Sequence, residues 1–129
     1  MRKGFTLVEI MIVVAVIALL ATLAIPNLLR SRVNANEASA QATLKTISTG
    51  CEQYAAANEG GYPTEFDELL NATPAFLNEN YTNGTRNGYN FTCEFGTGDG
   101  YTCDALPAQM NFTGTKRFRV STGAVMSTY

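Results

Sequence analysis

Apolar residues fill the start of the chain almost without interruption, and the pattern changes to mixed polar and apolar positions further on. From Ile10 to Ile25 every residue is Ile, Met, Val, Ala or Leu except for one Thr, and none is charged. The stretch from about Thr6 to Ile25 is roughly 20 residues, which as a helix spans a hydrocarbon core of about 30 Å. We therefore predict a membrane-spanning helix near the N-terminus.

A second helical pattern follows Pro26, a residue that removes one helix hydrogen bond and usually kinks the helix. Apolar residues then recur at alternating spacings of three and four, namely Ala40, Leu44, Ile47, Cys51 and Tyr54. This spacing is typical of an amphipathic helix that packs one face on a domain. The sequence Asn58-Glu59-Gly60-Gly61 supplies a stop signal, so we expect this helix over 30–58.

The rest of the chain carries signals for one short helix and a small sheet. Thr64 as N-cap, with acids in the first turn, predicts a short helix through about Leu70. Strand-like alternation occurs in three groups: Tyr89, Phe91, Cys93 and Phe95, then Tyr101, Cys103 and Ala105, then Phe118 and Val120. A last short strand is expected over 124–127. We predict an α+β fold, in which three or four antiparallel strands pack on the amphipathic stripe.

Composition excludes several classes of function. Only 16% of the residues are charged and the net charge is -2, so we expect no nucleic-acid partner. The chain contains no His, which excludes a His-based catalytic triad and a His-liganded zinc site. Glu94, Asp99 and Asp104 flank a glycine-rich turn, but their spacing does not match a calcium loop such as the EF-hand. We expect no enzyme activity, no cofactor and no metal.

Two features around the apolar run concern export. Basic residues precede it at Arg2 and Lys3, as in inserted proteins, yet no small-x-small cleavage site lies directly after it. The first such site is Ala38-Ser39-Ala40, so we expect the apolar segment to be retained.

Glu9 interrupts the apolar segment one turn in. An unpartnered carboxylate in lipid costs several kcal/mol, so an acid at this depth indicates a functional site.

The start of the chain resembles type IV prepilins and pseudopilins. The resemblance rests on Gly4-Phe5-Thr6-Leu7-Val8-Glu9 after a basic leader and before the apolar run, and it covers about the first 30 residues closely. It implies cleavage by a prepilin peptidase after Gly4, followed by methylation of the new amine of Phe5. It also implies that Glu9 pairs with the Phe5 amine of a neighbouring subunit during assembly, and that the helix loosens near Pro26.

On this resemblance, residues 1–4 are a leader peptide, 5–29 a transmembrane and polymerisation helix, and 30–129 a head domain. The expected function is that of a structural subunit of a type IV pilus-like filament. Its expected partners are copies of itself, the peptidase, the assembly machinery and the inner membrane. The precursor is a single-pass inner-membrane protein, and the mature chain belongs to a cell-surface filament or a periplasmic pseudopilus.

Other functions remain open at this point. One is a pseudopilin of a type II secretion system, and another is a minor pilin with a role in adhesion or DNA uptake. A membrane-anchored enzyme is disfavoured because the sequence shows no convergent cluster of acids or nucleophiles.

The three cysteines allow three single disulfides with one thiol left over. Cys93 and Cys103 lie opposite each other if the turn between their strands is centred on Gly98, so we favour this pair. Cys51 lies on the helix stripe facing the same sheet, and it either pairs with one of the two or remains a buried thiol.

Overall fold

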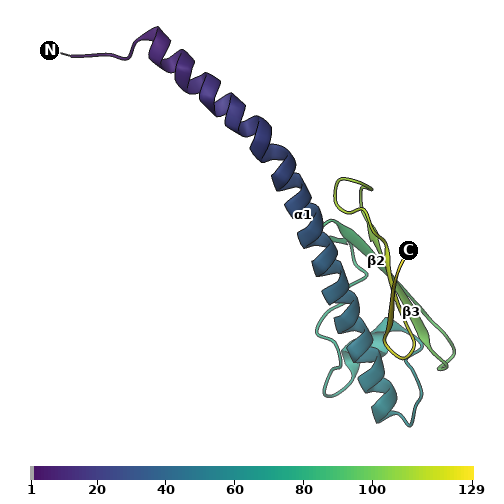
Figure 1. The fold of residues 1–129 in the computed structure, drawn as a ribbon. Helices are drawn as coiled ribbons and strands as arrows, with labels where there is room; N and C mark the ends of the chain where they lie inside the picture. Colours follow the sequence, from purple (N-terminus) through teal and green to yellow (C-terminus); the bar gives the residue numbers. More distant parts are fainter. Residues whose placement is uncertain (1) are drawn as a thin grey trace. The chain divides into compact units, whose positions relative to one another are not determined.

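The computed structural model describes residues 2–129 (Figure 1), so Met1, the first residue of the predicted leader, lies outside the described residues. The elements are α1 (Leu7–Ala57), α2 (Phe66–Asn71), β1 (Thr85–Arg86), β2 (Tyr89–Phe95), β3 (Tyr101–Pro107), β4 (Phe118–Ser121) and β5 (Val125–Thr128). The chain forms two compact units, which we call the N-terminal unit (Met1–Arg32) and the head unit (Val33–Tyr129). Helix α1 begins in the N-terminal unit and ends in the head unit.

Helix α1 contains Pro26 and stops at the predicted glycines. Pro26 lacks the amide that would bond to the carbonyl of Thr22. The hydroxyl of Thr22 in turn donates to the carbonyl of Ala18, with 2.9 Å between the oxygens. At the other end, Glu59 and Gly60 adopt φ angles of 56° and 89°, and the Gly60 amide donates to the Ala55 carbonyl at 2.8 Å. This left-handed pair ends the helix.

The sheet has five antiparallel strands in the order β1-β2-β3-β4-β5 within residues 2–129, one more than the upper number predicted. The additional strand is β1, which has only two residues and therefore no periodicity that a sequence pattern could reveal. Asn87 and Gly88 connect β1 to β2 with φ angles of 46° and 75°. Two central residues with positive φ are the signature of a tight hairpin turn.

The core of the head unit lies between α1 and one face of the sheet, and Figure 1 shows β2 and β3 alongside the part of α1 that belongs to this unit. Four residues of the predicted stripe are fully buried, and the fifth, Tyr54, is partly buried. The strands contribute the residues expected from the alternation: Tyr89, Phe91, Tyr101, Cys103, Ala105, Phe118 and Val120. The predicted α+β architecture, a long helix on an antiparallel sheet, is confirmed.

The start of α2 differs from the prediction. The helix begins at Phe66 with Glu65 at the N-cap position, one residue later than expected. Thr64 instead donates both its amide and its hydroxyl to the Glu68 carboxylate, at 3.0 and 2.8 Å. The hydrogen-bond donors of Thr64 are thus bonded to a side chain one turn further along, and Thr64 does not cap the helix backbone.

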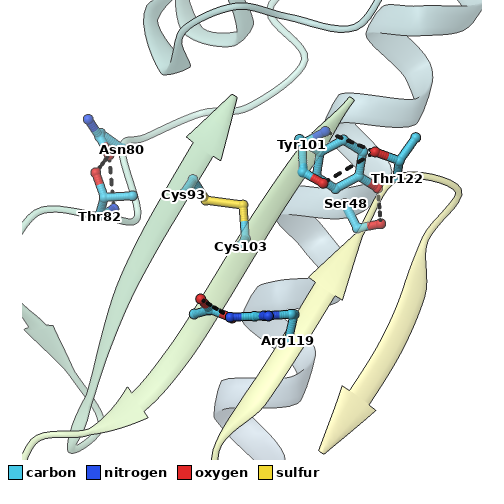
Figure 2. Close-up of a disulfide and its surroundings, with 9 residues drawn as sticks. Ser48, Asn80, Thr82, Cys93, Tyr101, Cys103, Arg119 and Thr122 are labelled. Carbon is cyan, nitrogen blue, oxygen red and sulfur yellow. Dashed lines mark hydrogen bonds and ion pairs between the residues drawn. A yellow bond between two sulfur atoms is a disulfide. The ribbon is translucent and has the colours of Figure 1, made fainter. Parts of the chain in front are cut away.

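Two acids on α1 connect the helix to the sheet. Glu52 accepts hydrogen bonds from the hydroxyls of Tyr101 and Tyr62, at 2.8 and 3.0 Å, and from the amide of Gly123 at 2.8 Å. The Tyr101 hydroxyl also lies 2.8 Å from the buried Ser48 hydroxyl, as Figure 2 shows. Burial, together with the nearby Glu52 carboxylate, raises the pKa of Tyr101, so this phenol remains protonated.

The second acid, Glu37, is buried at the other end of the core. It accepts hydrogen bonds from the Thr115 amide and hydroxyl, at 3.0 and 2.7 Å. Burial acts to raise the pKa of Glu37, but these two hydrogen bonds and the charge of Lys116 outweigh it and leave the pKa below its ordinary value. Glu37 is therefore an ionised anchor between α1 and the chain that enters β4.

Candidate functional site

The start of α1 is fixed by two reciprocal hydrogen bonds between Thr6 and Glu9. The Thr6 amide donates to Oε2 of Glu9 at 2.9 Å, and the Glu9 amide donates to the Thr6 hydroxyl at 3.2 Å. Thr6 is the N-cap and Glu9 is the third helical residue, which makes this pair a capping box. The carboxylate predicted as an assembly residue thus also holds the first turn of the helix.

The residues expected to be processed lie just before this capping box. Gly4 is exposed, and a β-carbon added there would have no atom within 4 Å. Phe5 is 87% exposed. The structure therefore places the Gly4–Phe5 bond in open, non-helical chain directly ahead of α1. Cleavage after Gly4 and methylation of Phe5 remain predictions.

The first part of α1 presents apolar side chains on all sides. The large apolar residues from Leu7 to Leu29 are exposed by 47–77% of their surface. Among the described residues, α1 is the one helix that is long and apolar enough to cross a membrane. A helix that is apolar all round is stable in lipid or when covered by other protein, but not in water. This surface is the main feature of the N-terminal unit.

The structure brings Glu9 to Thr6 but not to Pro26, which lies more than four turns further along α1. Thr6 was expected only as the start of the apolar stretch and as part of the resemblance, and its role as the N-cap was not predicted. The signal was present, because Thr followed three residues later by Glu, ahead of an apolar run, is the signature of a capping box.

The predicted disulfide is present. Cys93 and Cys103 are direct partners in the β2–β3 register and are joined by an S–S bond of 2.07 Å, drawn in yellow in Figure 2. Cys51 is a free, fully buried thiol in the core. Burial, helped by the charge of Glu52, raises the pKa of Cys51 to about 12. The third cysteine is therefore a small core residue, which was one of the alternatives left open.

Two of the three acids noted near the glycine-rich turn lie at the end of β2 and in the β2–β3 turn, and the third, Asp104, pairs with Arg119. Glu94 and Asp99 line an open pocket of about 390 Å³ there. No group of three or more His, Cys, Asp or Glu is placed to hold a metal ion anywhere in residues 2–129.

Comparison with known proteins gives one family match and several relatives. Residues 1–25 match the model of the prokaryotic N-terminal methylation motif. The chain is 37% identical over 91 residues to the type IV wide pilus major component PilA4 of Thermus thermophilus, a match that covers 67% of this chain and 69% of that protein.

Two further relatives match shorter parts. The type IV major pilin protein PilA of Myxococcus xanthus is 40% identical over 53 residues, which are 41% of this chain and 24% of that protein. Type II secretion system core protein G of Aeromonas hydrophila is 31% identical over 77 residues, 57% of this chain and 53% of that protein. The chain thus spans about a quarter and about half of these two relatives. No solved structure matches it.

Proposed function

Because the chain belongs to the type IV pilin and pseudopilin family, we propose that it is a structural subunit of a type IV pilus-like filament that polymerises through α1. The observation that carries this proposal is the first part of α1, whose apolar side chains are exposed in the isolated chain. In the precursor this surface lies in the inner membrane. In the filament the same surface is covered by the corresponding helices of neighbouring subunits.

Processing prepares the N-terminus for assembly. A prepilin peptidase cleaves after Gly4, and the new amine of Phe5 is methylated; the match to the methylation motif over residues 1–25 supports this step. Cleavage removes Arg2 and Lys3 and leaves one amine at the end of an apolar helix. The exposed chain at Gly4 gives a peptidase access to the bond.

Glu9 then favours the correct stacking of neighbouring subunits in the filament. Its carboxylate and the Phe5 amine of an adjacent subunit carry opposite charges in an apolar environment. Each charge alone is costly there, and pairing makes the burial of both tolerable. A subunit out of register leaves both charges unpaired, so the pair favours correct stacking. The chain's role is structural, and no catalytic step is part of it.

A second candidate is a pseudopilin of a type II secretion system, with a short periplasmic filament as the product. Relatives named type II secretion system core protein G, which are 31–35% identical over 63–77 residues, favour it. Both candidates use the same processing and the same helix. They differ in whether the filament extends to the cell surface.

The proposal is tested in a deletion strain complemented with the wild-type chain. We expect complementation to restore a filament whose subunit begins at methylated Phe5 by intact-mass analysis. A polymerised chain that retains Met1, or one that begins near Ala40, contradicts the proposal. Restoration of secreted proteins to the medium, without surface filaments, assigns the chain to the secretion pseudopilus.

A further inference from the structure

The head unit contains an excess of Asn-x-Thr sequences, the acceptor motif for N-linked glycans. Of the seven asparagines between residues 71 and 129, five have a threonine two positions later. Ser and Thr together make up 12 of these 59 residues, so chance alone would give such a spacing once or twice. None of the four asparagines before residue 71 has Ser or Thr at that position. The five motifs begin at Asn71, Asn80, Asn83, Asn90 and Asn111.

Transfer of a glycan to Asn requires its side-chain amide nitrogen to act as a nucleophile. An amide nitrogen is a poor nucleophile because its lone pair is shared with the carbonyl. A hydroxyl that donates a hydrogen bond to Oδ1 keeps electron density on that oxygen and makes the Nδ2 protons more acidic. A base then removes one of these protons more readily as the new bond forms. The motif best prepared for transfer is therefore the one whose Thr hydroxyl donates to the Oδ1 of its own Asn.

Asn80 makes this contact with its own threonine. Its Oδ1 accepts hydrogen bonds from the hydroxyl of Thr82 at 2.6 Å and from the amide of Thr82 at 2.9 Å. Figure 2 shows both bonds, with the side-chain nitrogen of Asn80 directed away from Thr82. Two donors on one atom identify that atom as the amide oxygen. Nδ2 is thus the end of the amide that these bonds leave open.

The threonine hydroxyls of two other motifs are bonded elsewhere. Thr85, which belongs to the Asn83 motif, donates to Oδ1 of Asn90 at 2.6 Å. The hydroxyl of Thr113 donates to a backbone carbonyl four residues earlier, at 3.1 Å. In the part of the chain that the structure describes, the Asn80 motif is the one in which the hydroxyl meets its own asparagine.

The Asn80 motif lies in a surface loop between α2 and β1. Residues 72–84 belong to neither a helix nor a strand. Asn80 and Thr82 are half-buried, and the residues on either side, 78–79 and 83–84, are exposed. Exposed loops of this kind are the parts of a folded chain that a modifying enzyme reaches most readily.

Arg86 holds the loop on both sides of the acceptor. Its guanidinium donates two hydrogen bonds to the carboxylate of Glu79, the residue before Asn80, at 3.0 and 2.9 Å. The same guanidinium lies 4.9 Å from the ring centre of Tyr81, the middle residue of the motif. Because these contacts are present before any enzyme binds, little ordering entropy is lost when the motif is recognised in this conformation.

We propose that Asn80 is the acceptor of an N-linked glycan that is transferred from a glycosyl diphosphate. Nδ2 forms a bond to C1 of the first sugar while the bond from C1 to the diphosphate oxygen breaks. The diphosphate leaves with the electron pair of that bond, and a base of the transferring enzyme takes one Nδ2 proton. This modification does not depend on polymerisation, so it goes beyond the proposed function and is tested separately from it.

Mass spectrometry of the chain, purified from the membranes of its native host, tests the site. We expect an intact mass above that of the processed polypeptide, and peptide fragmentation that places the added mass on Asn80. Addition of a whole oligosaccharide indicates a lipid-linked diphosphate as the donor, whereas addition of a single sugar indicates a nucleotide sugar.

Variants produced in the same host separate the roles of the two residues. Asn80→Gln removes the nucleophile, and Thr82→Val replaces the hydroxyl with a methyl group of similar size, so each is expected to lose the added mass. Thr82→Ser retains a hydroxyl and should retain the glycan. Asn83→Gln is the matched control, because it removes the neighbouring motif of the same loop, and it should also retain the glycan.

Three results would overturn the proposal while leaving the filament function intact. They are an intact mass explained by the processed polypeptide alone, an added mass that is absent from Asn80, and a glycan that persists in Thr82→Val. A chain that carries the glycan on Asn80 but forms no filament would instead contradict the proposed function and support the modification site.

Discussion

The Glu9 carboxylate and the Thr6 hydroxyl each accept a hydrogen bond from the other residue's backbone amide, at 2.9 and 3.2 Å. The same carboxylate that we propose to pair with a neighbour's amine therefore already has a role inside its own chain. Replacing Glu9 with Ala would remove both roles at once. Separate substitutions are needed to distinguish helix capping from subunit pairing.

Thr6→Ala tests the capping role. Loss of an N-cap hydroxyl costs about 0.5–2 kcal/mol of helix stability. We expect faster hydrogen exchange of the amides at the start of α1 in the processed, detergent-solubilised chain, with filament yield close to wild type. Thr6→Ser keeps a hydroxyl and serves as the control. Unchanged exchange in Thr6→Ala would show that the capping box does not hold this turn.

Glu37→Gln tests the buried anchor in the head unit. Removing the charge from a satisfied buried acceptor is expected to lower the free energy of unfolding by about 1–3 kcal/mol at pH 7. The pKa of Glu37 is lowered in the folded chain. The ionised carboxylate therefore contributes its full share to the free energy of unfolding at pH values above the ordinary carboxyl pKa of 4.5. That contribution is lost as the pH falls through the lower, folded-state value.

The measurement is thermal unfolding of the full chain in detergent, followed between pH 7 and pH 3. The difference in unfolding temperature between wild type and Glu37→Gln should become smaller as the pH approaches 3. Glu94→Gln, at an exposed position on β2, is the matched control and should track wild type throughout. A difference in unfolding temperature that stays constant with pH would contradict the role of the Glu37 charge.

The cysteines give a prediction on covalent structure. Peptide mapping without reduction should recover Cys93 linked to Cys103, and Cys51 as a free thiol. Because Cys51 is buried and its pKa is about 12, iodoacetamide should modify it only after denaturation. Replacing both Cys93 and Cys103 with Ser should lower the free energy of unfolding by about 2–4 kcal/mol. Rapid labelling of Cys51 in the native chain would refute its placement in the core.

Much of the fold could be predicted from periodicity alone. The stripe through Leu44 and Cys51 and the alternation in β2 and β3 repeat often enough to determine both the elements and the face that each buries. Once the faces were known, the register that places Cys93 opposite Cys103 followed from the turn. The two-residue strand β1 was not predicted, because it is defined by pairing across the Asn87-Gly88 turn and not by any sequence pattern of its own.

The polar anchors were not predictable in the same way. Glu37 lies three residues before Ala40, in register with the buried stripe, but no pattern in the sequence names its partner or that of Glu52. Their donors are 78 and 49 residues away, at Thr115 and Tyr101. Such pairs depend on tertiary placement. The exposed ring of Phe112 is a similar case, since only the structure shows that it does not reach the core.

The central claim, that the charge of Glu9 directs polymerisation, is tested most directly by the polymerised fraction of Glu9→Gln. Gln still fits the capping box, so this variant removes the charge while retaining the first turn of α1. We predict normal membrane insertion and cleavage, with the processed subunit in sheared filaments reduced at least about tenfold relative to wild type. A Glu9→Gln chain that polymerises to the wild-type level would contradict the claim.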